Sequence, residues 1–143
     1  MSAPTDVVIG SYTDGKEAPS VFHFKAAEHK AEAVLSEINP SFILKHDGYY
    51  YLVSEQKEGV ILVLDPSFKM ISRVKSMGED PCHLSIDHTG TYLVATNYSS
   101  GTTVICKLTD HIPTIIHSYI THEGSSNHPD RQASPHPHST VWA

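Results

Sequence analysis

One stretch of this sequence occurs twice, about 42 residues apart. Equivalent positions of the two copies are Pro40 and Pro81, Gly48 and Gly90, and Gly59 and Gly101. Between these prolines and glycines lie short runs rich in Tyr, Val and Leu, which favour β-strands. Self-similarity at this period, with short strands inside each copy, is typical of β-propellers built from four-stranded blades. We therefore predict an all-β fold of four-stranded antiparallel blades.

The length of 143 residues corresponds to about three blades, whereas complete propellers have roughly 4–8. We expect residues 1–38 to form three strands of a first blade, and residues 39–79 and 80–121 to form complete blades. Residues 122–143 are expected to form a polar loop and the first strand of a further blade, near His138 to Trp142. Within the two complete blades, Tyr51, Val53, Leu93 and Ala95 occupy matched second-strand positions and should face neighbouring blades as core.

In such blades, the turn between the second and third strands lies at the same end as the connection to the next blade. Long polar loops at one end of a ring favour a ligand site there, and the opposite end carries tight turns. The polar residues expected at this end are Ser11, Tyr12, Glu55, Gln56, Asp80 to His83, Asn97 to Gly101, and the loop from His122 to His138.

Charge and hydropathy exclude two classes of partner. The formal net charge of −6 argues against nucleic acid. No apolar run approaches the roughly 18 residues of a membrane span, and the N-terminus has no signal-peptide pattern. Cys82 and Cys106 fall inside predicted strands, and we interpret both as reduced thiols of a cytoplasmic protein.

Five motifs occur in an order and spacing that resemble the seven-bladed lactonase propellers, which include the bacterial-type 6-phosphogluconolactonases and the carboxy-muconate cyclases. These motifs are Gly10-Ser11-Tyr12-Thr13, Asn39-Pro40-Ser41-Phe42, Pro81 to Asp87 with Asn97 to Gly101, His128 to Gln132, and Pro135 to Ser139. The resemblance covers essentially the whole chain, whereas the family's propeller is more than twice as long. In the family, arginines and an acidic residue from later blades are thought to complete the site.

The resemblance implies hydrolysis of a sugar lactone, 6-phosphoglucono-1,5-lactone, in the pentose phosphate pathway, without a metal or other cofactor. His138 or His136 would act as general base, because an imidazole exchanges protons near neutral pH. Arg131 would hold an anionic group of the substrate. The other expected substrate-binding residues are Gln132, His83, Asn97 and Glu55.

Several alternatives stay open at this stage. His122, His128, His136 and His138 are close in sequence, but no third zinc ligand has a recognisable spacing. Adjacent Cys82 and His83 would point to opposite faces of a strand, so we interpret Cys82 as core rather than as a nucleophile. The competing functions are a muconate-lactone cyclase and a non-catalytic propeller that binds a partner. Open blade edges would also favour self-association.

Overall fold

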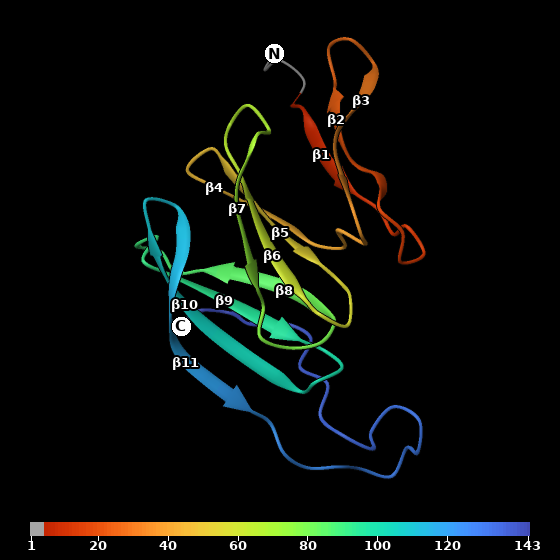
Figure 1. The fold of residues 1–143 in the computed structure, drawn as a ribbon, viewed down its shortest axis with the longest axis vertical. Coiled ribbons are helices and arrows are strands. Elements are labelled where there is room, and N and C mark those ends of the chain that lie inside the picture. Colours follow the sequence, from red (N-terminus) through yellow and green to blue (C-terminus); the bar gives the residue numbers. More distant parts are fainter. Residues whose placement is uncertain (1–4) are drawn as a thin grey trace.

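The computed structural model describes residues 5–143 of the chain, and within that range it contains three antiparallel sheets and no helix. The sheets follow one another along the chain and are arranged as a fan (Figure 1). The strands are β1 (Val7–Gly10), β2 (Ala18–Lys25) and β3 (Lys30–Glu37) in the first sheet; β4 (Ile43–His46), β5 (Tyr49–Ser54), β6 (Val60–Leu64) and β7 (Met70–Lys75) in the second; and β8 (Pro81–Ile86), β9 (Tyr92–Asn97), β10 (Thr102–Thr109) and β11 (Ile112–Thr121) in the third.

Each sheet is an up-and-down meander, in which consecutive strands are hydrogen-bonded neighbours. This arrangement confirms the predicted all-β fold of propeller blades. The sequence pattern predicts strands over residues 49–54, 60–64 and 70–75, and β5, β6 and β7 have these bounds. The third strand of the first sheet was predicted over Ala33 to Ile38 but begins earlier, at Lys30, because the turn before it takes only residues 26–29.

The strand predicted near His138 to Trp142 is not formed, and this part of the chain runs as an extended segment without ladder pairing. The segment is attached to β8 mainly through side chains. The Ser85 and Thr140 hydroxyls are 2.8 Å apart, and the Thr140 N–H donates to His83 Nδ1 at 3.4 Å. A strand requires a regular series of backbone hydrogen bonds, and these contacts provide none.

The hydrophobic core lies between the sheets. Alternate residues of β5 and β6 pack against the third sheet in a cluster that includes the predicted core residues Tyr51, Val53, Leu93 and Ala95. All four are fully buried, which confirms their assignment. The other face of the second sheet packs through Leu52, Leu62 and Leu64 against Val21 of β2. Burial of each of these side chains stabilises the fold by about 1.5–3 kcal/mol.

An ion pair between a buried carboxylate and a half-exposed guanidinium joins the first two sheets. Glu37 ends β3 with only 4% of its surface exposed, and it accepts hydrogen bonds from the guanidinium of Arg73 in β7. Ser54 Oγ donates to Glu37 Oε1 at 3.1 Å. A buried carboxylate is tolerated only when it is paired and hydrogen-bonded. Glu37 therefore connects the end of β3 to the end of β5 through Ser54 and to β7 through Arg73.

Apolar side chains are exposed on the two outer sheets. Val7 and Ile9 of β1 are 48% and 45% exposed, and Tyr119 and Ile120 of β11 are also exposed. Exposed apolar strands favour association. The exposed side chains are consistent with the predicted self-association of this chain, which stays a prediction.

The hairpin between β8 and β9 is held by the carboxylate of Asp87. It accepts hydrogen bonds from the backbone N–H groups of Thr89, Thr91 and Tyr92 and from the Thr89 hydroxyl. Burial raises the pKa of Asp87, but the hydrogen bonds outweigh this effect and lower the pKa to about 2.

We expect Asp87→Asn to lower the free energy of unfolding by about 1–2 kcal/mol at pH 7, allowing for solvent screening. The pKa in the folded state lies below the usual aspartate value of 3.8, so the stabilisation is present above about pH 4. It is lost as the pH falls from about 4 towards 2, where Asp87 becomes protonated in the native protein. Urea unfolding at pH 3 and pH 7 measures the difference, and the exposed Asp110→Asn is the control. A difference between Asp87→Asn and the native protein that does not change with pH would contradict this account.

Candidate functional site

A cavity of about 390 Å³ opens at the end of the sheets where the polar loops meet. We call it the loop-end cavity. Its lining residues come from six separate parts of the chain and are Tyr12, Ser41, Phe42, Glu55, Cys82, Tyr98 and His138. Of the loops that the repeat placed at this end, the structure brings Tyr12, Glu55, Cys82, Tyr98 and His138 to this cavity. A volume of this size is within the range of small-molecule sites.

The Asn39 side chain connects two of the loops that line this cavity, the β1–β2 and the β5–β6 connections. Its side-chain Oδ1 accepts from the Thr13 N–H at 2.8 Å, and its Nδ2 donates to the Glu55 carbonyl at 3.1 Å. The backbone of Asn39 has a φ of 42°, in the left-handed region that asparagine tolerates better than most residues. Asn39 thereby places Tyr12, next to Thr13, opposite Glu55.

Tyr12 and Glu55 form a direct hydrogen bond in the cavity. The Tyr12 hydroxyl donates to Glu55 Oε2 at 2.8 Å. Partial desolvation raises the pKa of Tyr12, although 65% of its surface is exposed, and the hydrogen bond to Glu55 and the charge of Glu55 raise the pKa further. The phenol therefore stays protonated at neutral pH and serves as a donor to the carboxylate.

The two candidate histidines lie on different sides of Tyr98. The His136 ring stacks on Tyr98 with centroids 4.5 Å apart, and its Nδ1 is 2.9 Å from the Tyr98 carbonyl. Because a carbonyl only accepts, His136 carries a proton on Nδ1. His138 meets the Tyr98 ring edge-on, with centroids 5.7 Å apart, and it alone of the two lines the loop-end cavity.

His83 and Cys82 lie beside His138. Burial lowers the pKa of His83, and the charge of His138 lowers it further, so His83 is neutral at pH 7. The His83 ring packs on Phe42, with centroids 4.5 Å apart. Cys82 is half-buried and lines the cavity, so the prediction that it is a core residue was wrong. A shift of register between Pro81 and His83 displaces Cys82 from regular alternation. Burial raises the pKa of its thiol.

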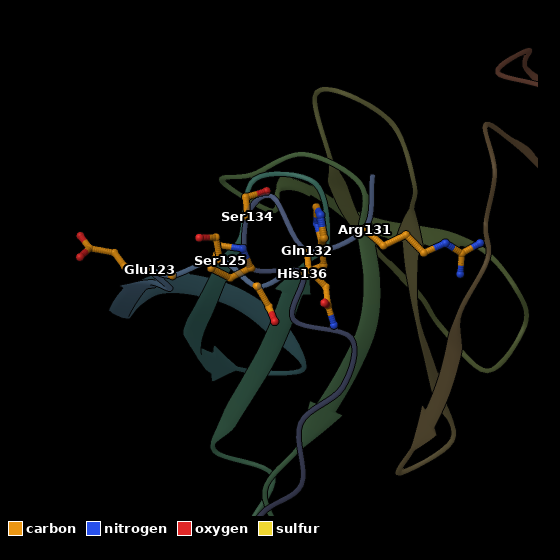
Figure 2. A pocket seen from close by; sticks show the side chains of 9 residues that line it. Glu123, Ser125, Arg131, Gln132, Ser134 and His136 are labelled. Carbon is orange, nitrogen blue, oxygen red and sulfur yellow. The ribbon is translucent and has the colours of Figure 1, made fainter. Parts of the chain in front are cut away.

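Arg131 and Gln132 are not brought to the loop-end cavity. They line a second, open cavity of about 430 Å³ formed by the polar loop, together with Glu123, Ser125, Ser134 and His136. Figure 2 shows the Arg131 side chain directed away from the other labelled residues. Gln132 is used by the loop itself, since its Oε1 accepts from the His128 N–H at 3.3 Å.

Asn97 is fully buried, so its predicted role in contacting substrate was wrong for this structure. Its Nδ2 donates to the Ser76 carbonyl and to Thr102 Oγ1, each at 3.1 Å. It also packs so closely on Gly78 that a Cβ there would lie 2.4 Å from Nδ2. Asn97 therefore fixes the connection between β7 and β8.

Sequence reasoning did not name five of the lining residues as site residues: Tyr12, Ser41, Phe42, Cys82 and Tyr98. Each falls within one of the motifs noted above, which was the available signal. The motifs themselves do not reveal which of their side chains turn inwards. Within residues 5–143, no three His, Cys, Asp or Glu side chains are grouped so that they could hold a metal ion.

Three sheets of antiparallel meanders, packed face to face with their polar loops at one end, define part of a β-propeller. The sequence model of the family described as lactonase, 7-bladed beta-propeller, matches residues 6–143, and the chain belongs to this family.

Similar solved structures share this fold. The periplasmic gluconolactonase PpgL of Pseudomonas aeruginosa is 24% identical, with a TM-score of 0.77 over 95% of this chain and 43% of its own. A candidate 6-phosphogluconolactonase of Bacteroides uniformis is 26% identical, with a TM-score of 0.71 over 92% of this chain and 41% of its own. A similar candidate from Bacteroides fragilis is 23% identical, with a TM-score of 0.72 over 92% and 40%. No curated protein matches the chain significantly. The chain thus spans about 40% of the length of these structures.

Proposed function

We propose that this chain belongs to an enzyme that hydrolyses a sugar lactone, with 6-phosphoglucono-1,5-lactone as the substrate and 6-phosphogluconate as the product. The observation that carries the proposal is the placement of the His138 imidazole and the Glu55 carboxylate in one cavity. The family supports lactone hydrolysis, and the names of the solved relatives support gluconolactones as the substrate class.

In the proposed reaction, His138 accepts a proton from a water molecule that attacks the lactone carbonyl carbon. Imidazole suits this role because it exchanges protons near neutral pH. The ring C–O ester bond then breaks, and the leaving oxygen takes the proton back from His138. The net change is the addition of one water molecule to give the open acid.

The structure favours His138 over His136 for this role, because His136 is engaged by Tyr98 and does not line the loop-end cavity. His83 Nδ1 accepts a hydrogen bond from the Thr140 N–H, and this contact anchors the segment that follows His138. We propose that His83 positions His138 rather than contacting the substrate.

Arg131 is proposed to pair with the substrate phosphate, and because it lies outside the loop-end cavity in this structure, the pairing requires the polar loop of residues 122–137 to shift towards the cavity when substrate binds. Arg131 is exposed, and the structure records no salt bridge to it within residues 5–143. We expect Arg131→Ala to raise KM for 6-phosphogluconolactone about tenfold, since a charge-assisted contact is lost, and to change KM for unphosphorylated gluconolactone less than twofold. Steady-state kinetics on both lactones measures this. An equal effect on both would contradict a phosphate contact.

The proposed activity is tested by the hydrolysis of freshly prepared 6-phosphogluconolactone, followed by acid release and corrected for spontaneous opening. The folded chain should accelerate opening above that background. A folded chain that leaves the spontaneous rate unchanged would overturn the proposal for these 143 residues.

The cytoplasm is the proposed compartment. Its support is that Cys82 and Cys106 are both free thiols, as is usual in reducing compartments. The relative from Pseudomonas aeruginosa is described as periplasmic, so the compartment is tested independently, by fractionation of cells that express the protein.

A further inference from the structure

We propose that Tyr12, Ser41 and Glu55 form a subsite that binds the neutral hydroxyl groups of a polyhydroxylated ligand, and that this subsite gives the loop-end cavity its preference for sugar lactones. The inference rests on the proposed lactone hydrolysis but concerns a different part of the cavity from His138. The three side chains come from the β1–β2, β3–β4 and β5–β6 connections.

The first observation is the unused hydrogen-bonding capacity of Glu55. A carboxylate offers about four acceptor sites. Within residues 5–143, the structure records one hydrogen bond to this carboxylate, from the Tyr12 hydroxyl to Oε2. Oε1 is thus available to accept from a ligand hydroxyl, and the Tyr12 oxygen retains a lone pair for a second hydroxyl.

The second, independent observation is the Ser41 hydroxyl. Its Oγ is buried and has no hydrogen-bond partner among residues 5–143, although Ser41 lines the same cavity. It lies close to the Tyr12 phenol but does not meet hydrogen-bond geometry with it. Buried polar atoms without partners are rare in folded proteins because their desolvation is not compensated. A ligand hydroxyl would compensate this one.

The charge of Glu55 determines which part of a ligand can occupy the subsite. An ionised carboxylate attracts hydroxyl donors and repels a phosphate or a second carboxylate. A substrate phosphate must therefore lie away from Glu55, and dicarboxylate lactones of the muconate type are disfavoured. A lactone without hydroxyl groups would leave Glu55 and Ser41 without new partners, which costs affinity.

The test compares D-glucono-1,5-lactone with δ-valerolactone, a lactone of the same ring size without hydroxyl groups. The readout is kcat/KM for D-glucono-1,5-lactone divided by kcat/KM for δ-valerolactone, with both values corrected for spontaneous hydrolysis. We expect Glu55→Gln and Tyr12→Phe each to lower this ratio at least about tenfold. The exposed Glu58→Gln and Tyr119→Phe are the matched controls outside the loop-end cavity. A ratio that Glu55→Gln leaves unchanged would overturn the subsite.

Ser41→Ala distinguishes a ligand-binding role from a structural one. Removing a buried hydroxyl without a partner should leave the melting temperature unchanged or raise it. The same substitution should lower the substrate ratio about threefold or more. A lower melting temperature with an unchanged ratio would assign Ser41 to the fold and overturn its place in the subsite.

A binding experiment separates this inference from the proposed function. D-gluconamide is a neutral polyol that contains no lactone, and NMR titration follows its binding at the backbone amides of Tyr12 and Ser41. We expect Glu55→Gln to raise its Kd about tenfold. If no lactone is hydrolysed but this shift in Kd is seen, the hydrolase proposal fails and the subsite stands. If the folded chain does not bind D-gluconamide, the subsite is overturned even where hydrolysis is observed.

Discussion

Replacing His138 with alanine is expected to lower kcat for lactone hydrolysis about 10²–10⁴-fold, the usual contribution of a general base. The cause is the loss of the imidazole that, among residues 5–143, lines the loop-end cavity. The fold should persist, because the polar contacts of this segment with β8 are made by neighbouring residues, including the 2.8 Å contact between Ser85 and Thr140. The measurement is steady-state hydrolysis of 6-phosphogluconolactone, with circular dichroism to confirm folding.

Three comparisons strengthen this experiment. The exposed His88→Ala, in the hairpin between β8 and β9, should retain the native rate. His136→Ala should cost less than tenfold, because this ring stacks on Tyr98 outside the cavity. Added imidazole should partly restore His138→Ala, since a missing proton acceptor can be replaced from solution, whereas a misfolded chain would not be restored. A folded His138→Ala variant with native kcat would remove His138 from the mechanism.

Gly10→Ala is expected to destabilise the fold by about 3 kcal/mol, at the upper end of overpacking effects. A Cβ at Gly10 would lie 2.0 Å from the Pro40 carbonyl oxygen, and a backbone atom cannot move aside as a flexible side chain can. Pro40 is buried at the junction between the first and second sheets. Relief of the clash would therefore separate β1 from the second sheet and move Tyr12, two residues further on, away from Glu55.

Urea unfolding measures this effect, and Gly15→Ala is the control. Among residues 5–143, no atom lies within 4 Å of a Cβ added to Gly15, but its φ of +74° disfavours alanine, so the expected loss is about 1 kcal/mol. Equal stabilities for the two variants would show that the contact with Pro40 is relaxed in solution. Loss of the Tyr12–Glu55 hydrogen bond in Gly10→Ala should also weaken binding of D-gluconamide.

Much of the fold was predictable because its determinants are local. The second sheet shows this best, since alternation along β5 and the turns on either side of it predicted both its bounds and the burial of Tyr51 and Val53. The extended segment around His138 was the main failure. Its composition suits a strand, but whether a strand forms depends on a regular backbone partner, which local composition does not specify.

The candidate site was predictable only in part. Glu55 and His138 could be placed together in advance, because the meander requires their connections to lie at one end of the sheets. The motif residues Asn97 and Arg131 were expected beside them, yet one is buried under the β7–β8 connection and the other lies on the polar loop outside the cavity. The orientation of a loop side chain depends on its contacts with the neighbouring sheet. The spacing of motifs along the sequence does not specify these contacts.

The sequence by itself determined the repeat, the order of strands and the face of each strand that is buried, because these follow from a period of about 42 residues and from alternation along each strand. Only the tertiary structure decided which polar groups share the loop-end cavity. Cys82 enters it through a shift in register, and Ser41 lines it with no hydrogen-bond partner among residues 5–143. Both outcomes depend on how one sheet meets the next, which is a property of the packed molecule rather than of any single segment.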